Sequence, residues 1–164
     1  MKLLNSVGLI LFACVCVGCR EGWQAATYPA RGMVTVNGTA ANGAVVTLYP
    51  IGGKVDVRNS RPWAIADQEG RFELQTYEAG DGAPIGEYNV TVTWPLDVTK
   101  MDLAMIDQLD SQFARPEQSL WKVEIEEGEN SLPTIAIDGV KLQTKVQNAK
   151  SRRIPRGPEM EPGQ

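Results

Sequence analysis

Hydrophobic and polar residues alternate along two central stretches of the chain, at 71–76 and 87–94. Successive side chains of a β-strand point to opposite faces, so a period of two predicts strands that are each buried on one face. Both stretches are rich in β-branched and aromatic residues, which favour strands. The expected buried faces are Phe72, Leu74 and Thr76 in the first strand and Tyr88, Val90, Val92 and Trp94 in the second.

Shorter hydrophobic stretches separated by turn residues predict further strands, at about 32–37, 44–49, 63–66, 121–125 and 134–137. Nearly every residue of 44–49 is apolar, so the pattern leaves its buried face open. Asp67 and Gly70 bound a turn, because Asp bonds nearby backbone N–H groups and Gly tolerates a positive φ. The pattern therefore predicts an all-β fold, a two-sheet antiparallel sandwich of about seven strands.

One stretch breaks the strand pattern. Within 97–113, Leu103, Ile106, Leu109 and Phe113 recur at spacings of three and four residues, which predicts a short amphipathic helix inserted between strands. The favoured interpretation is that this helix covers one end of the sandwich. The alternative is a docking helix, for which Leu103, Ile106 and Phe113 are the candidate partner contacts.

The N-terminus has the pattern of a secretion signal. Lys2 precedes an apolar run at 7–17, which is too short to span a bilayer as a mature helix, and a small residue precedes Cys19. Val17-Gly18-Cys19 resembles a bacterial lipobox, which implies that Cys19 receives a diacylglyceryl group and anchors the protein to a membrane. The alternative is an ordinary signal peptide that leaves a soluble secreted protein.

These features divide the chain into four parts. They are a signal peptide at 1–18, a lipid-anchored tether at 19–30, the β-sandwich domain at 31–139 and a tail at 140–164. The tail is basic and rich in Pro, and it has too few apolar residues to order itself by burial, so we expect it to be disordered. The alternative is a basic arm that touches an anionic polymer or a membrane surface.

The composition narrows the chemistry. Lys and Arg number 16 and Asp and Glu number 20 among 164 residues, and the resulting net charge of −4 argues against a nucleic-acid partner. The sequence has no His, which removes the usual general base, the usual catalytic triad and most zinc sites. Cys14, Cys16 and Cys19 all lie in the signal region, so the domain has no disulfide. We therefore expect a non-enzymatic protein without cofactor or metal.

Three carboxylates and a group of aromatic residues are the remaining candidates for chemistry. Asp67, Glu69 and Asp81 could cleave a glycoside or bind Ca²⁺ if they converged. Their turns are expected at opposite ends of the domain, so turn formation is the favoured role. The aromatic residues could form a platform on which sugars stack, although their positions in strands favour packing in the core or at a sheet edge. They are Trp63, Tyr77, Tyr88, Trp94 and Trp121.

Several short motifs follow one another in a specific order: Gly32-x-Val34-x-Val36-Asn37-Gly38, Asp67-x-x-Gly70-x-Phe72-x-Leu74 and Pro84-x-Gly86-x-Tyr88-x-Val90-x-Val92. Together they resemble the carboxypeptidase regulatory-like domain, a transthyretin-like β-sandwich. Motifs within 107–130 are similar to those of small bacterial lipoproteins built on this domain. The resemblance covers about 31–138. It implies the fold and a surface location, and it implies no reaction.

The sequence therefore predicts an exported, lipid-anchored, non-catalytic protein of the cell envelope, on its periplasmic or surface face, that acts as a structural or binding accessory. The expected partners are the membrane, through the lipid anchor, and an envelope protein or polysaccharide. The alternative function is a carbohydrate- or peptidoglycan-binding module, and a more remote one is a glycoside-cleaving enzyme. If consecutive strands alternate in direction, the loops at 51–62, 77–85 and 126–131 share the end where the tether attaches, and that end faces the membrane.

Overall fold

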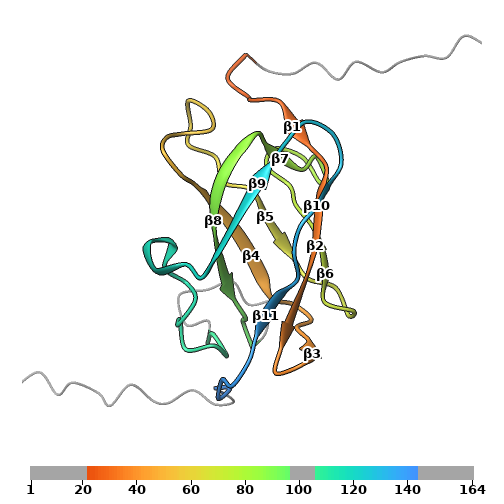
Figure 1. Cartoon of the computed structure of the whole chain (residues 1–164), viewed down its shortest axis with the longest axis vertical. Coiled ribbons are helices and arrows are strands. Elements are labelled where there is room, and N and C mark those ends of the chain that lie inside the picture. Colours follow the sequence, from red (N-terminus) through yellow and green to blue (C-terminus); the bar gives the residue numbers. More distant parts are fainter. Residues whose placement is uncertain (1–21, 97–105, 144–164) are drawn as a thin grey trace, which may run out of the picture.

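Figure 1 shows the computed structural model of the chain, which describes residues 22–96 and 106–143. Over these residues the chain is all-β, with one short 3₁₀ helix, η1 (Pro116–Gln118). The described part of the chain has no helix of the length and apolarity that a membrane crossing requires. The strands are β1 (Thr27–Tyr28), β2 (Ala30–Val36), β3 (Thr39–Ala40), β4 (Val45–Pro50), β5 (Trp63–Ile65), β6 (Arg71–Glu73), β7 (Ala83–Pro84), β8 (Gly86–Thr93), β9 (Trp121–Ile125), β10 (Asn130–Ser131) and β11 (Ile135–Ile137).

The strands form two larger sheets and one short pair. The four-stranded sheet has the order β5-β4-β8-β9, and all its pairings are antiparallel. The five-stranded sheet is built on β2, which pairs antiparallel with β3 and β6 but parallel with β10 and β11. The prediction of antiparallel sheets is therefore wrong for these last two pairings. The chain after β9 runs in the same direction as β2, so strands from these two segments are parallel where they lie side by side.

Side chains of both larger sheets meet in one hydrophobic core. The alternation predicted for the two central strands is confirmed at Phe72 and Leu74, which are 3% and 0% exposed, and at Tyr88, Val90 and Val92, which are also buried. Thr76 and Trp94 are only half-buried, and Thr91, predicted on the outer face, is buried at 4%. Strands β2, β4 and β11 complete this core with Val34, Val36, Val46, Leu48, Ile135 and Ile137. The buried face of β4, which the sequence pattern leaves open, is the one with Val46 and Leu48, because these two buried residues alternate with half-buried ones.

Every stretch for which the sequence predicts a strand contains one, namely β2, β4, β5, β6, β8, β9 or β11. The strand predicted at 71–76 is shorter, because β6 ends at Glu73. Beyond it, Gln75 and Trp63 exchange two backbone hydrogen bonds of 2.9 Å, so the chain passes from β2 in one sheet to β5 in the other. The two larger sheets are therefore joined along this side of the molecule.

The helix predicted at 97–113 is wrong for the part that the structure describes. Residues 106–113 form turns and an isolated bridge, and residues 97–105, with Leu103, lie outside the described part of the chain. Leu109 is fully buried in the core and Phe113 packs against it. The hydrophobic spacing therefore reflects a cover built of turns that places these two side chains inward.

The carboxylate of Asp107 accounts for this departure from a helix. It accepts the backbone N–H groups of Trp94, Leu109 and Ser111 at 2.8, 3.0 and 3.0 Å. A side chain that bonds nearby backbone groups competes with helical hydrogen bonding. Asp110 and Ser111 also have positive φ angles of 54° and 57°, which a right-handed helix does not contain.

The described strands place the loops at two opposite ends of the domain (Figure 1). Residues 22–28, 51–62 and 77–85 lie at one end, which we call the tether end. Residues 38–43 and 106–119 lie at the other, which we call the insertion end. The arrangement of these loops follows the prediction from alternating strands. Trp94 Nε1, for example, donates to the carbonyl of Asn42 at 2.8 Å across the insertion end.

Candidate functional site

The segment 22–30, predicted to be part of a tether, is built into the described structure. Strand β1 pairs antiparallel with β7, with Thr27 opposite Pro84 and Tyr28 opposite Ala83. Gly82 makes this approach possible. Its φ is 87°, and an added Cβ would lie 1.8 Å from the carbonyl oxygen of Tyr28. Only a residue without a side chain fits there.

Side chains then hold the start of the described chain against two loops. The rings of Trp23 and Tyr77 pack in a T-shaped arrangement, with a centroid distance of 5.4 Å and an angle of 88° between their planes. The guanidinium carbon of Arg58 lies 3.7 Å from the Trp23 ring centroid, in a cation–π contact. The hydroxyl of Tyr77 donates to Asp56 Oδ2 at 2.8 Å. We call Trp23, Asp56, Arg58 and Tyr77 the tether latch.

Backbone groups complete the hydrogen bonds of the latch. The N–H of Ala25 donates to the Tyr77 hydroxyl at 3.0 Å, and the N–H of Ser60 donates to Asp56 Oδ1 at 3.0 Å. The carboxylate of Asp81 accepts the N–H groups of Thr76 and Tyr77 at 2.6 and 3.0 Å, which positions the tyrosine. The latch therefore connects three segments that are distant in sequence.

The electrostatics of the latch suit this geometry at neutral pH. Burial raises the pKa of Tyr77 to about 12, and the hydrogen bond and charge of Asp56 act in the same direction, against the effect of the Ala25 N–H. Burial alone would raise the pKa of Asp56, but hydrogen bonds from Ser60, Tyr77 and the Arg58 backbone leave it lowered. The tyrosine thus keeps its proton and donates, while the carboxylate stays ionised and accepts.

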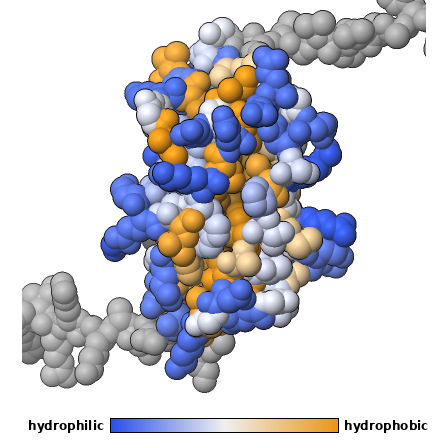
Figure 2. All heavy atoms as spheres, in the orientation of Figure 1, coloured by the Kyte–Doolittle hydropathy of each residue, from blue (hydrophilic) through white to orange (hydrophobic). Residues whose placement is uncertain are grey.

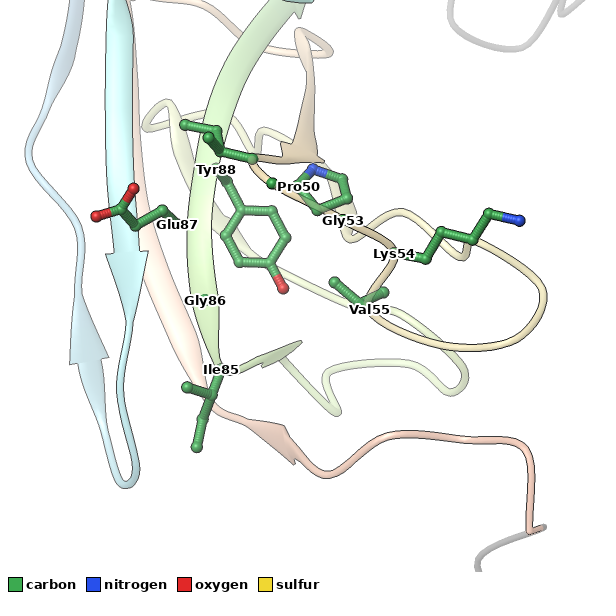
Figure 3. Close-up of a pocket in the computed structure, with 10 residues that line it drawn as sticks. Pro50, Gly53, Lys54, Val55, Ile85, Gly86, Glu87 and Tyr88 are labelled. Atoms are coloured by element: carbon green, nitrogen blue, oxygen red, sulfur yellow. The ribbon is translucent and has the colours of Figure 1, made fainter.

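A cavity of about 290 Å³ lies beside the latch, between the 51–62 loop and the start of β8. In Figure 3 the ring of Tyr88 stands at its centre, Ile85 and Val55 lie below and beside it, and Lys54 extends away from it. The buried Tyr88 hydroxyl donates to the carbonyl of Pro84 at 2.7 Å, and burial raises its pKa. The rest of the lining is Pro50, Ile51, Gly52, Gly53, Gly86 and Glu87. This lining has few polar side chains and they do not converge.

The residues predicted to be functional fall in different places. Cys19 and Leu103 lie outside the described residues. Ile106 and Phe113 are half-buried at the insertion end, and the Phe113 ring lies 5.4 Å from that of Trp121. The carbonyl of Phe113 also accepts the N–H of Val92 at 3.0 Å. These contacts agree with the interpretation of Phe113 as a cover of the core.

Two of the three candidate carboxylates, those of Asp67 and Asp81, act in turns, as the sequence predicts. Asp67 Oδ1 accepts the N–H groups of Glu69 and Arg71 at 3.0 and 2.8 Å, while Asp81 supports the turn before β7. Within residues 22–96 and 106–143, no group of His, Cys, Asp and Glu side chains is arranged to hold a metal ion.

The aromatic residues do not share one exposed surface. Tyr88 is buried, Tyr77 belongs to the latch, Trp94 bonds Asn42, and Trp121 packs on Phe113. Among the residues predicted to form a platform, only Trp63 is exposed, at 36%.

The tether end thus holds residues 22–28 through the β1–β7 pair and the latch. The comparisons add no relative, since no model of a known protein family matches the chain and no curated protein shows significant similarity to it.

The sequence pattern does not predict the latch. Trp23 lies in a segment without periodicity, and Arg58 and Asp56 lie in a Gly-rich, charged loop. The available signal was the presence of two aromatic residues, Trp23 and Tyr28, in a segment that was otherwise expected to be a spacer.

Proposed function

We propose that the protein is an exported, lipid-anchored, non-catalytic protein of the cell envelope that acts as a structural or binding accessory. The observation that carries this proposal is the docking of residues 22–28 at one end of the domain, directly after the lipobox-like Cys19. A spacer has no need of a built attachment. A built attachment gives a segment that joins a domain to an anchor a defined orientation.

The fold that goes with this proposal is a two-sheet sandwich of about seven main strands, of the carboxypeptidase regulatory-like type. The sheet orders β5-β4-β8-β9 and β10-β2-β11 and the common hydrophobic core support it. The motif glycine Gly70 supports it further, because its φ of 76° and the 2.5 Å between an added Cβ and the Val34 carbonyl require glycine there.

The non-catalytic role rests on chemistry. The sequence has no His, and two of the three candidate carboxylates, those of Asp67 and Asp81, hold turns. The cavity beside the latch presents one Lys and one Glu, which Figure 3 draws pointing in different directions. Contact with a partner through Leu103, Ile106 and Phe113 remains a proposal, and the packing of Phe113 on Trp121 favours the covering role for that residue.

The test is the substitution Cys19→Ser in the full chain, expressed with its own signal in a bacterium that acylates lipoproteins. We expect the wild type to fractionate with membranes and to carry a diacylglyceryl group by mass spectrometry, because two acyl chains give a stable anchor. The variant should accumulate unprocessed or be released. A processed variant that still fractionates with membranes like the wild type would contradict the proposal.

A further inference from the structure

Three large hydrophobic side chains are exposed at the tether end. Ile51, Val57 and Ile85 are 37%, 79% and 52% exposed. Ile51 and Ile85 line the same cavity from two different segments, and Val57 lies in the same loop as Ile51. Figure 2 shows hydrophobic spheres at this end of the domain, around the 51–62 loop of Figure 1.

The chain between Cys19 and the described structure is short. Gly22 is three residues from Cys19, and a fully extended chain advances only about 3.3–3.6 Å per residue, which limits the separation to roughly 11 Å. From Trp23 onward the latch and the β1–β7 pair hold the segment on the domain. Acyl chains on Cys19 would therefore enter the bilayer next to the tether end.

The distribution of charge determines which side of the tether end faces the bilayer. The 51–62 loop contains three basic residues, Lys54, Arg58 and Arg61, against one acid, Asp56. Asp56 and Arg58 belong to the latch and Arg61 lies 4.5 Å from the Tyr49 ring centroid, but the net charge of the loop stays positive. The acidic turn at 126–129 lies on the other side of the same end (Figure 1), and one of its acids, Glu129, is paired with Arg31. An anionic bilayer surface attracts the loop and repels the acidic turn.

We propose that the 51–62 loop and Ile85 form a membrane-contact face that places Ile51, Val57 and Ile85 among the lipid headgroups of an anionic bilayer. This proposal rests on the proposed lipid anchor at Cys19. The Lys54 side chain, which extends away from the cavity in Figure 3, can run along the apolar surface and keep its charge at the phosphates. The domain is then tilted and held against the membrane by two attachments, the acyl chains and this face.

The experiment uses the full chain and a single fluorescent label. After processing, Cys19 is the only native cysteine and is blocked by acylation, so Val57→Cys introduces one reactive thiol. The matched control is Leu120→Cys, because Leu120 is also apolar and 73% exposed but lies at the insertion end, just before β9. Both proteins are reconstituted in vesicles of phosphatidylethanolamine and phosphatidylglycerol with lipids brominated on their acyl chains.

We expect the brominated lipids to quench the probe at position 57 severalfold more than the probe at position 120. Ile85→Cys provides a second position, and its probe should be quenched like that at position 57. Equal, weak quenching at all three positions in protein that carries the acyl group would overturn the membrane contact alone. Absence of the acyl group by mass spectrometry would overturn both the contact and the anchor.

Two other occupants of the face are outcomes of the same experiment. Self-quenching of the position 57 probe that rises with protein density, without quenching by lipid, identifies a second copy of the chain and overturns the proposal. Protection of that probe only when peptidoglycan is added identifies a polysaccharide and overturns it as well.

Discussion

The two ends of the domain hold their chain segments in different ways. At the tether end, side chains from distant segments meet, and the aromatic ring of Trp23 contacts both Arg58 and Tyr77. At the insertion end, the carboxylate of Asp107 accepts hydrogen bonds from backbone N–H groups, among them those of Trp94 and Ser111. The first arrangement secures a terminus to the domain, whereas the second stabilises a loop. The difference is that residues 22–30 are held by side chains of distant segments, whereas the 106–119 loop is held mainly by a carboxylate of its own.

A change in the common core should affect both ends together. Phe72 is 3% exposed and its ring covers the backbone at Gly32. We expect Phe72→Ala to lower the free energy of unfolding by about 3–5 kcal/mol, whereas Val57→Ala on the exposed surface should change it by less than about 0.5 kcal/mol. Urea denaturation measures both. A loss for Phe72→Ala as small as that for Val57→Ala would show that the core is not shared.

Matched glycine substitutions at the two ends should have different effects. Gly82→Ala should disrupt the β1–β7 pair, because the new Cβ meets the Tyr28 carbonyl, whereas Gly38→Ala at the insertion end finds nothing within 4 Å at a similar positive φ. The backbone conformation alone costs about 1–2 kcal/mol at either position, and the clash should add about 1–3 kcal/mol at Gly82. Urea denaturation and proteolysis near residue 25 give the comparison. Equal losses would mean that β1 is not held by β7.

A smaller effect is expected for the insertion end itself. Asp107→Ala removes the acceptor of three backbone N–H groups, and we expect a loss of about 1–3 kcal/mol, with faster proteolysis of the 106–119 segment. Glu117→Ala, at an exposed position of η1, is the control. The tether end should keep its proteolytic resistance in both variants. Loss of that resistance in the Asp107→Ala variant would show that the two ends are coupled.

The smallest effect concerns pH and the latch. Tyr77 has a folded-state pKa of about 12, above its ordinary 10.0, so the stability it contributes is complete below pH 10 and is lost as the pH rises towards 12. The phenolate absorbance of the wild type minus that of Tyr77→Phe should therefore titrate near pH 12. The stability difference between the two proteins should shrink over the same interval. A difference titration centred at pH 10 would place Tyr77 outside the latch.

Residues with a clear period revealed most of the strands. Phe72, Leu74 and the buried residues of β8 alternate over enough positions to be recognised. Strands β1 and β7 have two residues each, which is too short for any period, and their pairing depends on the absence of a side chain at Gly82. The helix predicted around Asp107 is wrong because Ile106, Leu109 and Phe113 have helical spacing in the sequence but lie in a segment of turns. The latch depends on contacts that only the folded chain creates.

One feature of the five-stranded sheet has a mechanical consequence. Strands β2 and β11 pair in parallel, residue Val34 opposite Ile135 through Val36 opposite Ile137. The chain enters β2 from the tether end and leaves β11 at the insertion end, where the side chain of Asn37 bonds both backbone groups of Val140 at 2.9 and 3.2 Å. A pulling force between the two termini would thus act along these strands in opposite directions. It would load their hydrogen bonds together, in shear, and would not peel them apart one by one. A domain fixed at one terminus and pulled at the other is in this way arranged to resist extension.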